Sequence, residues 1–145
     1  MFQNAKSFDH PLNFDTSNVT DMRAMFYRAT WFNHPLNFNT SRVIDMSFMF
    51  YRAEWFNKPL NFSTSSVTTM SHMFYYSERF NQSLNFDTSR VTNMKDMFQN
   101  ANSFNQLLKF NLYSMKEEDL NIWDNAKQYM FTYADSFDPN NWDPQ

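Results

Sequence analysis

A motif that recurs every 24 residues constrains this chain more than any other feature of its sequence. The repeat reads Phe-Asn-x-Pro-Leu-Asn-Phe-x-Thr-Ser-x-Val and continues as Met-x-x-Met-Phe-x-x-Ala. The invariant columns are Phe8, Phe32, Phe56, Phe80 and Phe104; Leu12, Leu36, Leu60, Leu84 and Leu108; and Phe14, Phe38, Phe62, Phe86 and Phe110. Units of this length stack on one another, because a single unit cannot bury its own apolar face. The sequence therefore predicts a solenoid that works through its exposed surface.

Composition argues against several classes of protein. The net charge of −3 and the pI of about 5.5 give no basic surface for nucleic acid. The absence of cysteine excludes a disulfide framework, a thiolate nucleophile and a cysteine-based zinc site. No apolar stretch reaches the roughly 18 residues of a membrane span, so no membrane insertion is predicted. Histidine is scarce and no glycine-rich phosphate loop is possible, so we expect neither an enzyme nor a bound cofactor.

Within one repeat, the apolar spacing changes from two residues to three and four. Residues 11–14 alternate between polar and apolar, which predicts a short strand with Leu12 and Phe14 inward. Residues 15–17 form a turn, and the apolar positions from Val19 to Ala29 then lie on one face of a helix of about three turns. The predicted fold class is α/β: a leucine-rich-repeat-type right-handed solenoid with short parallel strands on one face and short helices on the other.

The repeat resembles that of a known family of surface proteins. Residues 32–53 read Phe-Asn-His-Pro-Leu-Asn-Phe-Asn-Thr-Ser-Arg-Val-Ile-Asp-Met-Ser-Phe-Met-Phe-Tyr-Arg-Ala. This run is similar to the repeat of the BspA-like leucine-rich-repeat surface proteins, which include bacterial and mycoplasmal surface lipoproteins. The resemblance covers residues 1 to about 111. It implies a role in adhesion or interaction at the cell surface or outside the cell, with no catalytic residues to transfer.

The chain departs from that family in two columns. The family often has glycine before the repeat's alanine, whereas this chain has no glycine at all. The residues at that place are Arg28, Arg52, Tyr76 and Asn100, and we expect a strained loop there. The family's usual strand tryptophan is replaced by Phe14, Phe38, Phe62 and Phe86, which we interpret as a conservative exchange in the core.

The repeat divides the chain into two parts. Residues 1–111 form the array of 24-residue units, which starts in the middle of a repeat. Residues 112–145 are predicted to be a C-terminal capping unit with a longer helix between Met115 and Met130. The repeat phase returns after that helix, displaced by about nine residues. The first residues lack the basic and apolar regions of a signal peptide, so we expect the chain to be a segment of a longer protein.

Several polar columns are also constant. Asn33, Asn57, Asn81 and Asn105 are predicted to form a buried amide ladder that satisfies loop backbone groups, with an exposed binding row as the alternative. Asn13, Asn37, Asn61 and Asn85 are predicted to face out from the sheet, where they are either structural or ligand-binding. The Thr16 and Ser17 columns are interpreted as helix caps, and an ice-matching threonine row is the remote alternative.

Columns that vary between copies are free to carry function. Exposed tryptophan, tyrosine and arginine are the residue types enriched at interaction hot spots. Stacking would bring such residues into one aromatic and basic strip at the end of each helix, although the rings could instead shield the edge of the core. The predicted binding residues are Tyr27, Arg28, Trp31, Tyr51, Arg52, Trp55, Tyr75 and Tyr76.

No metal site is predicted. His10 and His34 share a column, but a two-histidine site needs a third ligand and the next residue in that column is Lys58. The predicted function is a non-enzymatic interaction or adhesion module for a protein partner. Glycan binding is the first alternative, and an architectural unit that associates end to end through its uncapped N-terminal edge is the second.

Overall fold

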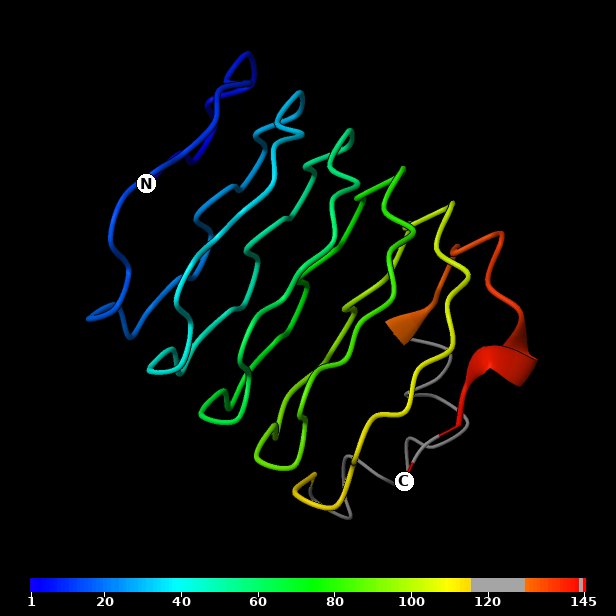
Figure 1. Cartoon of the computed structure of the whole chain (residues 1–145). Helices are drawn as coiled ribbons and strands as arrows, with labels where there is room; N and C mark the ends of the chain where they lie inside the picture. Colours follow the sequence, from blue (N-terminus) through cyan, green and yellow to red (C-terminus); the bar gives the residue numbers. More distant parts are fainter. Residues whose placement is uncertain (116–129, 144) are drawn as a thin grey trace.

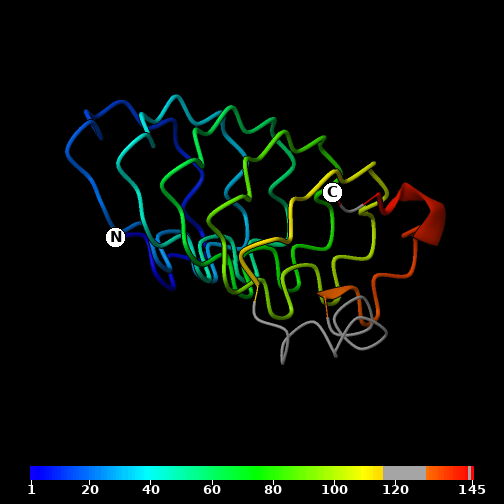
Figure 2. The ribbon, with the colours of Figure 1, turned by 90° about the horizontal axis from the view of Figure 1, so that it is seen from below.

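The protein is a stack of similar coils, each one repeat long. A computed structural model describes residues 1–115, 130–143 and 145. The coils lie side by side in chain order from the N-terminal to the C-terminal end (Figure 1). The same order is visible when the stack is seen from below (Figure 2). The repeat of the sequence is thus a repeat in space.

Regular secondary structure is almost absent from the described part of this stack. The 3-10 helix η1 (Pro139–Asn141) is the one helix whose bounds lie within the described residues, and Asp138 caps it by accepting a hydrogen bond from the Asn140 N–H. Strand pairing in residues 1–115 and 130–143 is limited to isolated parallel bridges, which join Asp21 to Asp45, Asp45 to Thr69, Thr69 to Asn93 and Leu108 to Trp142. The predicted fold class, an α/β leucine-rich-repeat-type solenoid with strands on one face and helices on the other, is therefore wrong.

Linked β-turns occupy the segments that were predicted to be helices. In residues 22–29 the N–H of Met25 donates to the Met22 carbonyl, and the N–H of Tyr27 donates to the Ala24 carbonyl, each at 3.2 Å. Ala24 and Arg28 have φ of 53° and 56°, which a right-handed helix does not allow. A positive φ at the third residue of a turn is the feature of type II turns. Linked turns place apolar residues inward at the three- and four-residue spacing that also typifies a helix.

The remaining N–H groups of this turn side connect neighbouring coils. Every second residue from 22 to 28 donates its N–H to a carbonyl 23 residues further along the chain, over distances of 2.7 to 3.0 Å. The same four bonds recur from residues 46–52 and from residues 70–76. Backbone bonds therefore fix the distance and the register between coils on this side.

Left-handed backbone occurs twice in each full coil of the array. One column is the place where the resembling family often has glycine, which explains that preference because glycine has no Cβ to clash there. This column consists of Asn4, Arg28, Arg52, Tyr76 and Asn100, with Tyr133 in the last coil. The second column was not anticipated from the sequence. It consists of Ala24, Phe48, His72 and Asp96.

Two columns of phenylalanine rings form the interior. Within a coil, the two rings stack at centroid distances near that of Phe50 and Phe56, 4.2 Å. Between coils, each ring stacks on its equivalent, for example Phe50 on Phe74 at 5.6 Å. The predicted phenylalanine, leucine, valine and methionine core is confirmed in the interior coils, where these side chains are buried. In the first coil the core is incomplete, since Phe8, Leu12 and Val19 are only partly buried and Phe14 is 38% exposed.

The opposite side of an interior coil, such as residues 34–40, is extended but not paired as a strand. At the last coil the equivalent segment is paired, through the bridge between Leu108 and Trp142. Leu36, Phe38 and Thr40 are buried and alternate with exposed residues. Among the described residues of the array, no backbone hydrogen bond joins this segment to the next coil through residues 34–38. Pro35 contributes to this, because proline has no N–H to donate. The predicted strand has the right inward residues and the wrong hydrogen bonding.

Threonine side chains connect the coils on this extended side. The Thr40 hydroxyl donates to the Ser63 carbonyl at 3.0 Å, and the Thr64 hydroxyl donates to the Asp87 carbonyl at 3.0 Å. The predicted helix caps are therefore wrong, because no helix follows these residues and the threonine hydroxyls bond between coils. The turn beside them is closed locally instead, since the Ser17 N–H donates to the Asp15 carboxylate.

The repeat phase returns in the last coil, as predicted. The Asp138 N–H donates to the side chain of Asn105, 33 residues earlier in the sequence. Phe131 and Phe137 continue the two ring columns on Phe98 and Phe104, at 5.4 and 6.1 Å. The longer helix predicted between Met115 and Met130 lies largely outside the described residues.

Candidate functional site

A row of stacked tyrosines lies on the turn side. Tyr27 stacks on Tyr51 at 4.6 Å, and Tyr51 stacks on Tyr75 at 4.8 Å with parallel ring planes. All three side chains are half-buried. The row forms because backbone bonds hold the same turn position at a constant spacing in three successive coils, from Tyr27 to Tyr75.

A column of arginines flanks this row. The guanidinium carbon of Arg28 lies 5.4 Å from the Tyr27 ring, and that of Arg52 lies 4.8 Å from the Tyr76 ring. Tyr76 is in turn 4.9 Å from Tyr75. The Nε atoms of both arginines are buried and have no hydrogen-bond partner. No carboxylate of the described residues forms an ion pair with either guanidinium.

Sequence reasoning missed the column on the other flank of the tyrosines. Phe48 stacks on His72 at 4.6 Å, and His72 Nε2 lies 3.1 Å from Asp96 Oδ2. Phe48 is 5.9 Å from Tyr51, and His72 is 5.7 Å from Tyr75. The signal that could have found this column is its 24-residue phase, because four different residues at one repeat position indicate a surface column.

Burial shifts the pKa of two groups in this cluster. Desolvation lowers the pKa of His72 below its ordinary value of 6.5, and nearby Lys95 acts in the same direction while Asp96 opposes it. The buried Nδ1 atom of His72 has no partner, which further disfavours a second proton. Desolvation also raises the pKa of Tyr75, with Tyr51, Tyr76 and Asp96 adding to the shift and Arg52 opposing it. Both groups are therefore neutral near pH 7.

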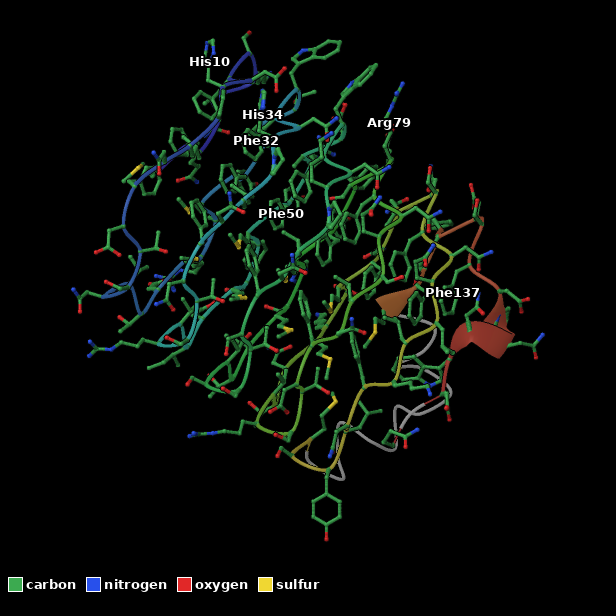
Figure 3. All side chains as sticks on the ribbon, viewed as in Figure 1. His10, Phe32, His34, Phe50, Arg79 and Phe137 are labelled. Carbon is green, nitrogen blue, oxygen red and sulfur yellow. The ribbon has the colours of Figure 1, made fainter. Side chains whose placement is uncertain are left out.

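The two tryptophans form a separate row with an arginine. Trp31 stacks on Trp55 at 4.7 Å, and the Arg79 guanidinium carbon lies 3.4 Å from the Trp55 ring. Trp31 is 50% exposed. Arg79 lies at the edge where the coils turn, as do His10 and His34, whereas Phe32 and Phe50 point into the interior (Figure 3). Arg79 was not among the predicted binding residues, although it occupies the tryptophan column in the next coil.

The eight predicted binding residues thus lie in two rows. The tyrosine row stacks ring on ring from one coil to the next and meets the arginine column at its two ends, where Arg28 contacts Tyr27 and Arg52 contacts Tyr76. Trp31 contacts Trp55. In the described part of the chain, no ring contact joins the tryptophan row to the tyrosine row. The arrangement offers aromatic side chains and, among the described residues, two cations without an ion-pair partner.

The asparagine ladder behaves largely as predicted. Asn57 N–H donates to the Asn33 side chain, and Asn81 N–H donates to the Asn57 side chain, both at 3.0 Å. These amides satisfy backbone groups of the next coil, which confirms their structural role. They are half-buried in the interior coils and exposed at Asn105, so the ladder is less buried than expected. The Asn13, Asn37, Asn61 and Asn85 column is exposed, as predicted.

Two further features bear on possible ligands. His34 Nε2 lies 3.1 Å from Asp9 Oδ1, and no group of three potential metal ligands comes together in the described ranges. The described residues also contain no helix that is both long and apolar enough to cross a membrane.

Comparison with known proteins gives one match. The model of a family described as "Mycoplasma protein of unknown function, DUF285" matches residues 1–63 and, a second time, residues 61–145. No curated protein and no solved structure matches the chain.

Proposed function

We propose that this chain, which belongs to the DUF285 family of Mycoplasma proteins of unknown function, is a non-enzymatic interaction module that binds a protein partner through the exposed rows of its stacked coils. The resemblance of the repeat to BspA-like surface proteins supports an adhesive role at the cell surface. The same resemblance supports a location of the protein at the cell surface or outside the cell.

The observation that carries this proposal is the exposed tryptophan row. Trp31 keeps half of its surface in solvent although the interior coils bury almost every other large apolar side chain. A tryptophan is costly to leave in water, and tryptophan and arginine are among the residue types enriched at binding hot spots. Stacking on Trp55 holds the indole in one orientation, which reduces the entropy lost on binding.

A binding experiment with matched variants tests the proposal. Surface proteins of cultured cells are captured on the immobilised chain and identified, and the affinity of the purified partner is then measured. We expect Trp31→Ala with Trp55→Ala to weaken binding about tenfold or more. Ile44→Ala is the control, because Ile44 is 49% exposed in a different column. Equal affinity of the double variant and the wild type, or an equal loss with Ile44→Ala, would contradict the proposal.

Glycan binding is the second candidate, and the exposed indole of Trp31 favours it. Trp31 is 50% exposed, and an exposed indole ring suits the stacking of a sugar ring. A glycan array separates the two candidates. A glycan that binds the wild type and loses its signal in the same double variant, with no protein partner captured, would replace the first proposal.

A further inference from the structure

All three buried side-chain atoms without a hydrogen-bond partner in the described residues flank the tyrosine row. They are Nε of Arg28, Nε of Arg52 and Nδ1 of His72. Buried polar groups in folded proteins are nearly always paired, so a cluster of exceptions calls for an explanation. We infer that Arg28 and Arg52 together form a receptor for a pair of carboxylates on a partner protein, an inference that rests on the proposed function and names the chemistry of the partner.

The two arginines are held in place before any partner arrives. The N–H of Arg28 donates to the Tyr51 carbonyl at 2.7 Å, and the N–H of Arg52 donates to the Tyr75 carbonyl at 2.8 Å. Both residues have left-handed backbone, with φ of 56° and 54°. The tyrosine rings beside them restrict the side chains further. The guanidinium groups therefore need little reorganisation to bind a ligand.

Electrostatics favours an anion at this place. Burial deprives each Nε of water without supplying an acceptor, which raises the free energy of the cation. Two like charges on adjacent coils, with no carboxylate paired to either among the described residues, also repel each other. A carboxylate bound at the Nη atoms of each arginine would balance its charge and so offset both terms, because the guanidinium fork matches the two carboxylate oxygens.

The surroundings favour carboxylates of a protein over a highly charged polymer. The chain carries a net charge of −3, and Asp96 lies on the other flank of the tyrosine row. A polyanion such as a heavily sulfated glycan would meet repulsion beyond the two arginines. Two carboxylates on a protein would avoid that repulsion, while the Tyr27 and Tyr51 rings supply amphipathic contact area of the kind common in protein interfaces.

A peptide titration tests this inference. The probe is a soluble peptide of alternating glutamate and serine, compared with the same peptide carrying glutamine in place of glutamate. We expect the glutamate peptide alone to bind, and we expect Arg28→Gln with Arg52→Gln to raise its Kd about tenfold for each arginine lost. Arg42→Gln with Arg90→Gln removes the same charge from a different column and should leave the Kd within about twofold.

A second variant guards against a folding defect in the first. Arg28→Lys with Arg52→Lys keeps the charge but removes the planar fork, and it should bind with an intermediate Kd. A Kd for the glutamate peptide that is the same in the wild type and the Arg28→Gln, Arg52→Gln variant would overturn the inference. So would arginine-dependent binding of a heparin-derived oligosaccharide without binding of the peptide.

The two proposals fail in different ways. If the peptide does not bind but the tryptophan variants lose a captured partner, the carboxylate receptor is wrong and the interaction module stands. If the tryptophan variants change nothing while the peptide binds through the arginines, the receptor stands and the tryptophan row is not the interaction surface.

Discussion

The turn side and the extended side of each coil are joined to their neighbours by different bonds. On the turn side, backbone N–H groups of residues 46–52 bond to carbonyls of the next coil. On the extended side of the interior coils, the links come from side chains, namely the Thr40 and Thr64 hydroxyls and the Asn33 and Asn57 amides. Backbone bonds hold the spacing between coils whatever side chain the surface residue carries, which explains why the tyrosine and arginine rows are ordered on the turn side.

Removal of a core ring should expose this difference most strongly. Phe50 stacks on Phe26, Phe56 and Phe74, whereas Phe62 on the extended side has no ring contact among the described residues although it is only 6% exposed. Phe50→Ala is expected to lower the free energy of unfolding by about 3–5 kcal/mol. Phe62→Ala should cost about 1.5–4.5 kcal/mol less, because Phe50 loses three aromatic pairs and each pair adds roughly 0.5–1.5 kcal/mol. Urea unfolding followed by circular dichroism measures both, and equal losses would refute the role of ring stacking.

Loss of a threonine hydroxyl should matter only on the extended side. Thr64 is buried and its hydroxyl donates to the Asp87 carbonyl, so Thr64→Val should cost about 1–2 kcal/mol by leaving that carbonyl unpaired. Thr68 is the matched control. Its hydroxyl and its own N–H share the Ile44 carbonyl, so Thr68→Val should change stability by less than about 0.5 kcal/mol. The same urea unfolding measurements apply, and a larger loss at Thr68 than at Thr64 would reverse the assignment.

Glycine should stabilise the turn side and destabilise the extended side. Ala24 has φ of 53°, which costs an L-residue about 1–2 kcal/mol, while the entropy of glycine costs about 0.5–1 kcal/mol. Ala24→Gly is therefore expected to raise the free energy of unfolding by about 0.5–1 kcal/mol. Asn37 has no positive φ, so Asn37→Gly should lower it by about 0.5 kcal/mol. Thermal unfolding of the two variants would disprove this account if both moved in the same direction.

The smallest expected effect is a dependence on pH that comes from the turn side. His72 has a folded-state pKa below its ordinary 6.5, so the folded protein binds fewer protons than the unfolded chain. Its contribution to stability is present above about pH 6.5 and is lost as the pH falls through the folded pKa. His72→Gln should flatten this part of the stability curve. An unchanged slope between pH 7 and pH 5 in the variant would show that other groups cause it.

The apolar columns could be predicted from the sequence, but the hydrogen bonding could not. Periodicity shows which residues point inward, and Phe32, Leu36 and Met46 are buried as expected. However, the spacing from Val19 to Ala29 fits both a helix and linked turns, because both structures return to the same side every three or four residues. One signal against a helix was available in the sequence: Arg28 stands where the resembling family often has glycine, the residue that adopts a left-handed backbone most easily. A left-handed residue rules out a continuous helix.

The candidate site was predicted in part for the same reason. The tyrosines and tryptophans were found because their residue types recur in phase. The column of Phe48, His72 and Asp96 was missed because its residues differ in type from one repeat to the next. Their contacts with one another are evident only in the folded structure. The Nε atoms of Arg28 and Arg52 are buried without a hydrogen-bond partner. The sequence could not show this, because it does not reveal how deeply a single atom on a surface turn is buried.

The last coil aligns with its neighbour although Asn105 and Asp138 are 33 residues apart instead of 24. A coil therefore packs on the one before it through contacts between equivalent rings and amides. The number of residues that connect the two coils does not determine this packing. A gene for such a protein can gain or lose whole units, or accept unrelated sequence at a junction, and the neighbours on either side still meet the same partners. Growth by duplication then lengthens the available surface without the need to invent a new core.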